Sequence, residues 1–349
     1  MADELANFFD LTRSDLEEAI QRIGQARYRA DQVWNWVYRQ RVDSFQAMTN
    51  LPATLRRQLA SQFSLNPATV IASQSDDESG THKHVLRLGD GETIETVLMK
   101  EPYGYTVCLS TQVGCPLACT ICATGQAGFH RNLSVGEIVF QLLHFDRLLM
   151  QQLPPSQVTN IVFMGMGEPL LNYEATVGAI ARFCDPYGLA LSAHSITVST
   201  VGLPQRILDL AAEPYPVRLA ISLHSADEAV RARLLPIAGR ISLEELIAAC
   251  HEYARVRQQR ITFECVLVKG INDSQRDARR LVSLIGALPA HVNLIPLNPI
   301  ENCDLQPTTP EAIEYFRSEL RRSRIACTVR YSRGVRIRAG CGQLRGQAE

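Results

Sequence analysis

The sequence lacks a long hydrophobic run, a strong excess of charge and a glycine-rich dinucleotide motif. No apolar stretch approaches the roughly 20 residues that a helix needs to cross a bilayer, and the acidic start MADELANFFDL lacks the layout of a signal peptide. We therefore expect a cytoplasmic protein that makes no membrane contact. No G-x-G-x-x-G follows a predicted strand, which argues against dinucleotide binding.

The net charge of −1 gives no overall signature of nucleic-acid binding, but the arginines are unevenly distributed. Five arginines fall between Arg22 and Arg41, and nine fall between Arg317 and Arg345, where Glu319 is the one acid. Local basic faces of this kind can neutralise phosphates even when the whole chain is nearly neutral. The alternative is a solvated arginine-rich surface that binds nothing. With 46% of its 349 residues hydrophobic, the chain can bury a full core.

Residues 1–72 have helical periodicity and are predicted to form a small helical domain. The segment LTRSDLEEAIQRIG begins with a capping residue, either Thr12 or Ser14, and PATLRRQLASQF is a further candidate helix. Between them, RADQVWNWVYRQ places three apolar side chains on one helical face: Val33, Trp36 and Val37.

Residues 73–101 are predicted to form a linker followed by a β-hairpin. The linker is the polar run SQSDDESG at 73–80. After it, KHVLRLGDGETIETVLM alternates apolar and polar residues on both sides of Asp90 and Gly91, a pair that favours a two-residue hairpin turn.

Residues 102–335 repeat strand and helix. The predicted strands are YTVCLST, VTNIVFMG, SITVST, VRLAISLH, ITFECVLV and HVNLIPLN, with CTVRYSR as a last strand. Two of the helices open with capping boxes, at Ser134 with Glu137 and at Ser242 with Glu245. The spacing predicts an α/β fold, a partial (β/α)6 TIM-like barrel, with a doubly wound sheet as the alternative.

Three cysteines are spaced C-x3-C-x2-C in VGCPLACTICATG, directly after the first strand of the repeat: Cys115, Cys119 and Cys122. Enzymes built from β/α units place active-site loops at such positions. A structural zinc site needs four ligands in a closed tetrahedron, for which Cys108 would be the fourth. Three clustered thiolates are better suited to a [4Fe–4S] cluster that leaves one iron open to another ligand.

Residues 336–349 form a tail that contains Cys341 in AGCGQLRG, flanked by glycines in an arginine-rich stretch. A cysteine in such a polar tail has no core to join, so we predict that it is reactive. Cys108 is expected to face the same barrel mouth. The remaining cysteines lie singly in apolar segments and are predicted to be core residues: Cys184, Cys250, Cys265, Cys303 and Cys327.

Polar residues or glycine end four of the predicted strands. In MGMGEP, Gly167 lets the backbone approach a ligand and Glu168 can accept a hydrogen bond from an ammonium group. Ser199, His224 and Asn298 end three other strands. Each of these residues alone would be compatible with an ordinary turn or a structural role. Because they rim the same end of one barrel, together they predict a site.

The cysteine spacing resembles that of the radical S-adenosylmethionine (SAM) enzymes, whose SAM binds the open iron; Ile121 departs from the aromatic residue usual there. Over nearly its whole length the chain resembles the RlmN/Cfr family of RNA adenine methyltransferases. The residues that carry this resemblance are YRADQVWNWVY, MTNLP, CLSTQVGC, GFHRNLSVGEI, FMGMGEPLLN, ISLHS, LIPLNP and CGQL, in the family's order.

This resemblance implies that two SAM molecules are consumed per methyl transferred. One SAM methylates Cys341. A second, on the cluster, is cleaved to a radical that takes hydrogen from that methyl, and the carbon radical adds to the adenine ring. Cys108 then attacks the Cys341 sulfur, giving a transient disulfide that frees the RNA. Glu95, in IETVLM, is the implied proton acceptor. The implied SAM contacts are Gly167, Glu168, Ser199, Ser222, Leu223, His224 and Asn298.

The resemblance also implies the substrates: 23S rRNA at adenosine 2503 and tRNAs at adenosine 37, both methylated at carbon 2. We expect precursor rRNA, a flavodoxin-type electron donor and a monomer. RNA binding is assigned to the domain at 1–72 and to the tail arginines. Three alternatives stay open: a Cfr-type carbon-8 methyltransferase, a zinc-stabilised RNA-binding protein without catalysis, and a radical SAM enzyme acting on a small molecule. The candidate arginines of the N-terminal domain are Arg22, Arg27, Arg29, Arg39 and Arg41.

Overall fold

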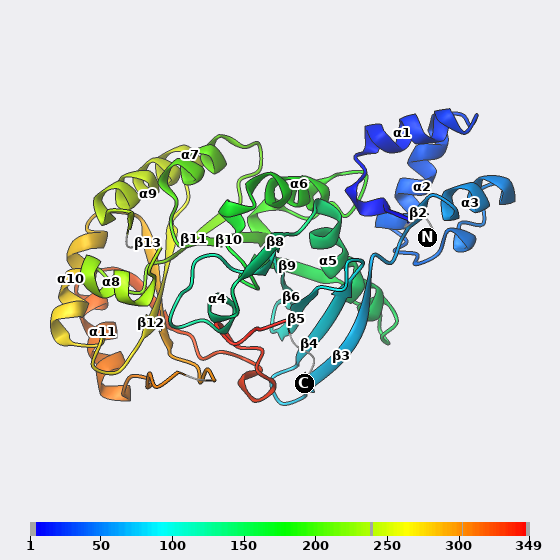
Figure 1. The fold of residues 1–349 in the computed structure, drawn as a ribbon. Coiled ribbons are helices and arrows are strands. Elements are labelled where there is room, and N and C mark those ends of the chain that lie inside the picture. Colours follow the sequence, from blue (N-terminus) through cyan, green and yellow to red (C-terminus); the bar gives the residue numbers. More distant parts are fainter. Residues whose placement is uncertain (1–4, 238–239, 302, 347–349) are drawn as a thin grey trace.

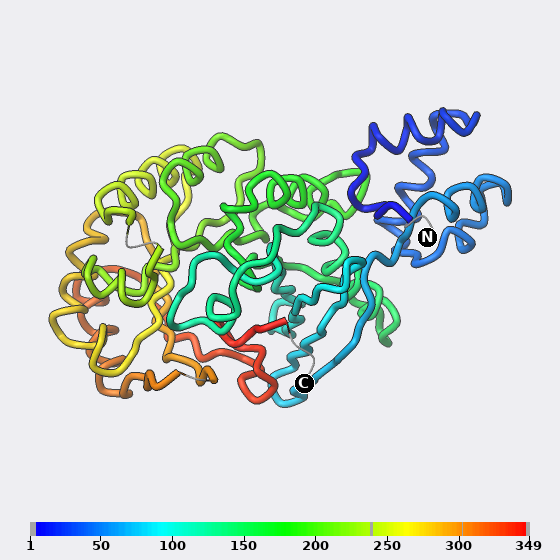
Figure 2. Tube along the Cα trace, viewed as in Figure 1, coloured from blue at the N-terminus to red at the C-terminus, as the bar shows by residue number. Residues whose placement is uncertain are grey.

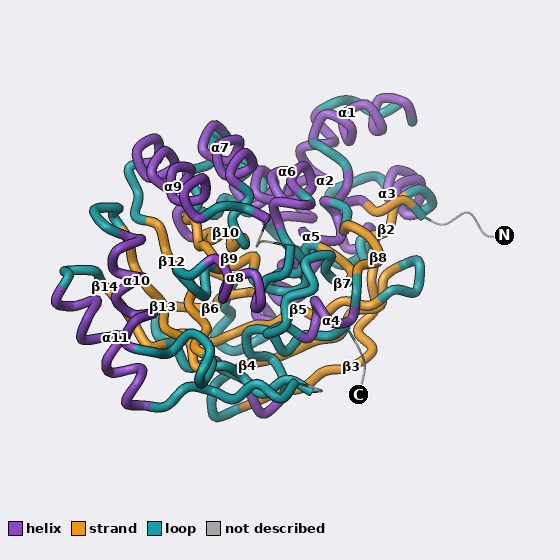
Figure 3. The backbone as a smooth tube through the Cα atoms, turned by 60° about the vertical axis from the view of Figure 1, so that its left-hand side comes forward, coloured by secondary structure: helices purple, strands orange, loops and turns teal. Residues whose placement is uncertain are grey.

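The computed structural model describes residues 5–237, 240–301 and 303–346. A curved sheet runs through the molecule with helices on its outer side, and a separate group of helices from the N-terminal part lies at one end (Figures 1 and 3). The sheet has ten strands among the described residues. In this part of the chain no helix is long and apolar enough to span a membrane.

The N-terminal part of the chain forms helices, as its periodicity predicts. Thr12 caps the first of them through a complete capping box with Asp15, because each side chain accepts from the other residue's backbone amide. Two short parallel strands pair within the domain. Its elements are β1 (Ala6–Asn7), α1 (Arg13–Arg22), α2 (Tyr28–Tyr38), α3 (Ala53–Ala60) and β2 (Phe63–Ser64).

The buried face of α2 differs in part from the prediction. Val33 and Val37 are buried, but Trp36 is only half-buried. Trp34 and Tyr38 are buried in its place, with ring centroids 4.5 Å apart. Residues 33, 34, 37 and 38 form a stripe at helical spacing, which turns Trp36 towards the edge of that face.

The N-terminal helices are fixed to the rest of the chain by apolar and ionic contacts. The ring of Phe9 lies 6.1 Å from that of Phe140 in α5 (Val135–Met150). Arg41, one of the arginines predicted to bind RNA, has its side chain only 12% exposed, and its Nε lies 2.8 Å from the Asp146 carboxylate. Arg41 therefore holds the domain on the barrel rather than facing RNA.

The predicted linker at 73–80 is wrong, because a strand covers its first half. Strand β3 (Ala68–Asp76) pairs antiparallel with β4 (Thr81–Leu88), which pairs with β5 (Thr93–Glu101) around the predicted hairpin turn. Because β3 is an edge strand that exposes much of one face, its polar composition imitates that of a loop.

The partial barrel is confirmed. Each of its strands pairs in parallel with the next one in the sequence, so the strand order never reverses as it would in a doubly wound sheet. The hairpin strands extend the same sheet beyond the first barrel strand. The barrel strands are β6 (Gly104–Cys108), β9 (Val158–Phe163), β10 (Ile196–Thr200), β11 (Arg218–Ser222), β12 (Ile261–Leu267), β13 (Ala290–Pro296) and β14 (Ala326–Val329).

Helices cover the outside of these strands and connect them. Ser134 begins α5 with the predicted capping box, and Ser242 accepts from the backbone amide of Glu245 at the start of α9. Of the predicted core cysteines, Cys250 and Cys265 are buried, whereas the other three are half-buried. The helices after α5 are α6 (Tyr173–Cys184), α7 (Pro204–Ala212), α8 (Glu228–Leu234), α9 (Leu243–Arg257), α10 (Gln275–Ile285) and α11 (Pro310–Arg322).

Candidate active site

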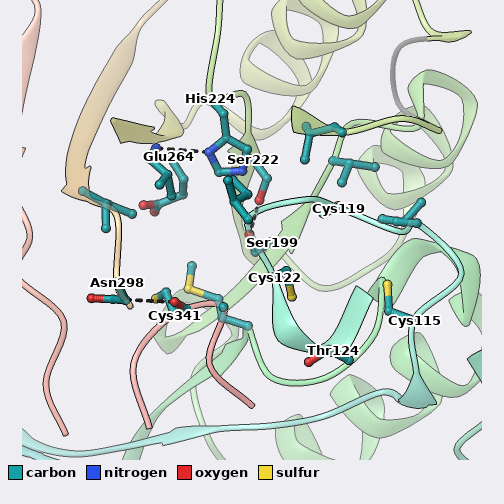
Figure 4. Close-up of a pocket in the computed structure, with 18 of the residues that line it drawn as sticks. Cys115, Cys119, Cys122, Thr124, Ser199, Ser222, His224, Glu264, Asn298 and Cys341 are labelled. Atoms are coloured by element: carbon teal, nitrogen blue, oxygen red, sulfur yellow. Dashed lines mark hydrogen bonds between the residues drawn. The ribbon is translucent and has the colours of Figure 1, made fainter. Parts of the chain in front are cut away.

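A cavity of about 160 Å³ opens at the carboxyl ends of the barrel strands. It brings the predicted cysteine loop, most of the predicted strand-end residues and the tail cysteine into one place (Figure 4). This is the end of a β/α barrel where active sites are found. Among the residues that line it are Cys115, Cys119, Cys122, Gly167, Glu168, Ser199, Ser222, His224, Asn298 and Cys341.

A small antiparallel sheet and a short helix hold the cysteine loop. Strands β7 (Gln112–Gly114) and β8 (Phe129–Asn132) pair on either side of α4 (Ala123–Ala127). Gly114 has a φ of +73°, and a Cβ there would lie 1.9 Å from the carbonyl oxygen of Gly128. Only glycine allows the two strands to close at this point, so the loop ends are fixed close together.

The thiols of Cys115, Cys119 and Cys122 lie along one side of the cavity (Figure 4). Burial raises the pKa of Cys115 to about 12, and burial together with the two neighbouring thiols raises that of Cys119. No group of three or more His, Cys, Asp or Glu side chains in the described part of the chain is close enough to hold a single metal ion. Three thiols around one hollow nevertheless suit a cube of four irons, because each binds a different iron.

The predicted Gly-Glu pair follows β9. Gly167 has a φ of +99°, and a Cβ there would lie 2.6 Å from the side chain of Gln112. Only glycine fits at this position, because any other residue would be strained and would clash with Gln112. The Glu168 carboxylate accepts hydrogen bonds from the backbone amides of Leu170 (3.0 Å) and Val201 (2.9 Å). Burial raises the pKa of Glu168 to about 7. Its carboxylate thus joins two strand ends, and each oxygen keeps a lone pair for a ligand.

Ser199, Ser222 and His224 lie at neighbouring strand ends (Figure 4). The two hydroxyl oxygens are 3.5 Å apart. The His224 Nδ1 accepts a hydrogen bond from the backbone amide of Val266 (3.1 Å), and burial lowers the pKa of His224 to about 3. The ring is therefore neutral, with its proton on Nε2. His224 also has a φ of +58°, a strained conformation that is typical of functional sites.

Asn298 contacts the tail in this structure. Its Nδ2 donates to the carbonyl oxygen of Cys341 (2.9 Å) and to the hydroxyl of Ser332 (2.7 Å). Asn298 thus helps to position the Cys341 segment at the cavity, as Figure 4 shows. Its Oδ1 lies on the other side of the amide group and can accept from a ligand.

Three of the predicted residues do not line the cavity: Leu223, Cys108 and Glu95. Leu223 is fully buried, and its backbone amide donates to the carbonyl oxygen of Glu264. Cys108, at the end of β6, is 8% exposed. Burial, and then the nearby Cys341 thiol, raises the pKa of Cys108 to about 12. Cys108 is therefore a protonated thiol at neutral pH, close enough to Cys341 for the two to interact electrostatically.

Glu95, the predicted proton acceptor, lies outside the main cavity on strand β5. It is 2% exposed, and its Oε1 lies 2.8 Å from Nζ of Lys83 on the neighbouring strand. Two backbone amides of the tail donate to Oε2. Three partner atoms thus hold the Glu95 carboxylate, one from Lys83 on the hairpin and two from the tail, and the tail covers it.

Two charged residues of the main cavity, Glu264 and Arg330, were not among those predicted from the sequence. Glu264 lies in the middle of β12 and is 5% exposed; its Oε1 accepts from Asn293 (2.9 Å). Within the described residues its Oε2 has no hydrogen-bond partner. The electrostatic influence of Cys341 is the main cause that raises the pKa of Arg330. An acid inside the apolar strand ITFECVLV was the signal that could have found Glu264.

A curved parallel sheet with a three-cysteine loop at the carboxyl end of its first barrel strand defines a radical SAM enzyme. Residues 109–282 match the family model of the Radical SAM superfamily. Residues 6–65 match the model described as the ribosomal RNA large subunit methyltransferase N-terminal domain. The enzyme uses a [4Fe–4S] cluster and SAM.

Relatives that match over nearly the full length of this chain identify its family. A dual-specificity RNA methyltransferase RlmN 1 of Myxococcus xanthus is 43% identical over 100% of this chain and 96% of its own length. A probable dual-specificity RNA methyltransferase RlmN of Desulforamulus reducens is 41% identical over 98% of this chain and 97% of its own. The crystal structure of a radical SAM methyltransferase from Sphaerobacter thermophilus matches with a TM-score of 0.94 and 45% identity, covering 98% of this chain and 100% of that one.

The chain belongs to the RlmN family of dual-specificity RNA methyltransferases. It is therefore a SAM-dependent enzyme. This membership overturns the alternative of a zinc-stabilised protein without catalysis.

Proposed function

We propose that this enzyme methylates carbon 2 of adenosine, at position 2503 of 23S rRNA and position 37 of tRNAs, and consumes two SAM molecules per methyl. The observation that carries this proposal is that Cys341 lines the same cavity as the cysteine loop. Carbon 2 of adenine is electron-poor and cannot attack the methyl of SAM as a nucleophile. A thiolate can, so a cysteine beside the SAM cavity serves as the first methyl acceptor.

The roles of the residues follow from their positions. We assign Cys115, Cys119 and Cys122 to the cluster. When bound, the cluster supplies the electron that cleaves SAM. Support for these ligands is that the three thiols line a cavity that also contains polar strand-end residues such as Ser199 and Asn298. The proposed SAM contacts are Gly167, Glu168, Ser199, Ser222, Leu223, His224 and Asn298, with Leu223 acting through its backbone.

Cys341 carries the methyl, and its carbon becomes bonded to the adenine ring. Once carbon 2 has lost its proton, the Cys108 thiolate attacks the Cys341 sulfur, and the S–S bond forms as the bond between that sulfur and the transferred carbon breaks. The released carbon takes up a proton to become the methyl group, and the remaining unpaired electron passes back to the electron-transfer partner. Support for this pairing is the electrostatic interaction between the two thiols. Glu95 takes the proton that leaves carbon 2. For that step the tail has to release Glu95, because tail amides occupy one of its carboxylate oxygens.

The rest of the proposal concerns domains and partners. We assign RNA binding to residues 1–72, where Arg22 and Arg27 are exposed, followed by the hairpin at 73–101, the barrel at 102–335 and the tail at 336–349. Residues 347–349 lie outside the described part. We propose precursor 23S rRNA and tRNA as substrates, a flavodoxin-type reductant, a monomeric state and a cytoplasmic location.

One preparation tests this function. The enzyme is purified anaerobically, its iron is measured, and the peptide containing Cys341 is examined by mass spectrometry. We expect about four irons per chain and a methylated Cys341. Incubation with 23S rRNA fragments and tRNA, followed by nucleoside analysis, should give 2-methyladenosine from both. A product methylated at carbon 8 would assign the Cfr-type reaction instead. An unmodified Cys341 in active enzyme would contradict the methyl-carrier role.

A further inference from the structure

A second groove, of about 310 Å³, lies on the other side of the Cys341 segment from the main cavity. Its walls include the side chains of Arg336, Arg338, Arg345 and Glu301. The tail lines both hollows: Cys341 and Gly342 line the main cavity, and tail residues on either side of them in the chain, such as Arg338 and Gln343, line the groove. Figure 2 shows this part of the tail, in red, passing between the cysteine loop and the hairpin strands.

Acidic side chains form ion pairs with the guanidinium groups of this groove. Glu301 bridges two of them, with Oε1 2.7 Å from Nη1 of Arg338 and Oε2 2.6 Å from Nη1 of Arg345. Nη1 of Arg336 lies 2.5 Å from Oε2 of Glu78. Most of these side chains are well exposed, at 76% for Arg336, 46% for Arg338 and 43% for Glu301. Exposed ion pairs contribute little to folding stability, so stability does not explain why three arginines gather here.

The groove adjoins both groups that must reach the target carbon. The tail carries Cys341 at one end of this segment, and the backbone amide of Arg345 is hydrogen-bonded to Glu95 at the other (2.5 Å). The backbone amide of Ala123 also donates to the carbonyl oxygen of Gly342 (2.7 Å), which fixes the tail beside the cysteine loop. A base placed between Cys341 and Glu95 brings its own ribose-phosphate chain to this part of the surface.

We propose that the groove formed by Arg336, Arg338 and Arg345 binds phosphates of the RNA substrate next to the target adenosine. This inference rests on the proposed function and names the part of the surface that receives the RNA backbone. A guanidinium group can donate two parallel hydrogen bonds to two oxygens of one phosphate. In the free enzyme Glu301 takes the place of that anion, and the phosphate displaces it. The site recognises charge and shape rather than sequence, which suits an enzyme that accepts two kinds of RNA.

The test measures RNA affinity as a function of salt concentration. The probe is a 23S rRNA stem-loop transcript containing adenosine 2503, followed by fluorescence anisotropy. The variants are Arg336→Ala, Arg338→Ala and Glu301→Gln. Arg255→Ala is the matched control, because Arg255 is likewise exposed and paired with a glutamate, but on α9. The slope of log K against log salt reports how many phosphates are neutralised, at about 0.7–0.9 per contact.

We expect each groove arginine variant to reduce the magnitude of that slope by about 0.7–0.9, which corresponds to one phosphate contact. Each variant should also weaken RNA binding several-fold at moderate salt. Glu301→Gln should tighten binding, because the competing anion is gone. Misfolding would weaken RNA binding in every variant, so weaker binding by the arginine variants together with tighter binding by Glu301→Gln excludes it as the cause. Arg255→Ala should match the wild-type enzyme. The same variants should cleave SAM at the wild-type rate without RNA when dithionite is the reductant.

Unchanged slopes and affinities in both arginine variants would overturn the proposal. It would also be overturned if the variants bound RNA normally but turned over slowly only with a protein reductant, since the groove would then dock that protein. Failure of the proposed function is a separate result: the wild-type enzyme itself would then neither bind nor methylate the transcript.

Discussion

The backbone amide of Arg345 donates a 2.5 Å hydrogen bond to Oε2 of Glu95. The next amide, of Gly346, donates to the same oxygen at 3.1 Å, and Lys83 pairs with the other oxygen. The tail that carries Cys341, the proposed methyl acceptor, therefore also covers Glu95, the proposed base. Under the proposed mechanism, release of Glu95 by the tail and presentation of Cys341 to RNA would involve the same segment.

Glu95→Gln should lower methyl transfer to RNA by about 100-fold or more, the usual size of a general-base contribution. The amide keeps the shape of the side chain but cannot take the proton from carbon 2. SAM cleavage without RNA should stay near the wild-type rate. Radiolabelled methyl incorporation measures the first and liquid chromatography of 5′-deoxyadenosine the second. Glu92→Gln, on the same hairpin but exposed and paired with His130, is the control; full activity of Glu95→Gln would remove the base assignment.

Cys108→Ala should trap the enzyme on its RNA, because the thiol that breaks the adduct is missing. Denaturing gels should show a covalent protein–RNA species in place of methylated product. In the wild-type enzyme, burial raises the pKa of Cys108 to about 12. Attack requires the thiolate, so release should speed up by about tenfold per pH unit between about pH 7 and pH 9. A variant that releases product normally would assign this step to another group.

Cys119→Ala should reduce iron to well below the expected four or so atoms per chain, because a thiolate of the proposed cluster site is lost. The brown absorption of the cluster and the cleavage of SAM should disappear together. Cys303→Ala is the matched control: its thiol lies 3.7 Å from the carbonyl oxygen of Thr120 in the same loop but outside the main cavity. Equal iron in both variants would contradict the ligand assignment.

His84 is buried and His144 is half-buried, and Nδ1 of His84 lies 2.7 Å from Nε2 of His144. Burial is the main cause that lowers both pKa values to about 4; His82 adds to the effect on His84, and His84 and Arg147 add to that on His144. The unfolded chain, with ordinary histidine pKa values, binds more protons between about pH 6.5 and pH 4. The free energy of unfolding should therefore fall as the pH drops through this range.

The expected loss is on the order of 1–3 kcal/mol for each histidine at about pH 4. Urea unfolding at a series of pH values measures it. In the double variant His84→Asn/His144→Asn this part of the pH dependence should vanish, whereas His130→Asn, at an exposed histidine, should keep it. An unchanged slope in the double variant would show that other groups cause the acid sensitivity.

Local patterns determined much of this protein. Capping residues such as Ser134, alternation around Asp90 and Gly91, and repeated apolar strands gave the helices, the hairpin and the barrel, because each depends on neighbours along the chain. The predicted linker failed because the polar face of edge strand β3 looks like a loop until its partner β4 is known. The choice of Trp34 over Trp36 on the buried face of α2 likewise depended on packing against other elements.

At the site, the sequence by itself determined which residue types are present, and the spacing of Cys115, Cys119 and Cys122 pointed to the cofactor class. Only the tertiary structure decided that Cys341, more than 200 positions later in the chain, lines the same cavity. It also decided that Glu264 faces that cavity and that the tail covers Glu95. Such contacts join segments far apart in sequence, and they form only when the barrel closes one element against another.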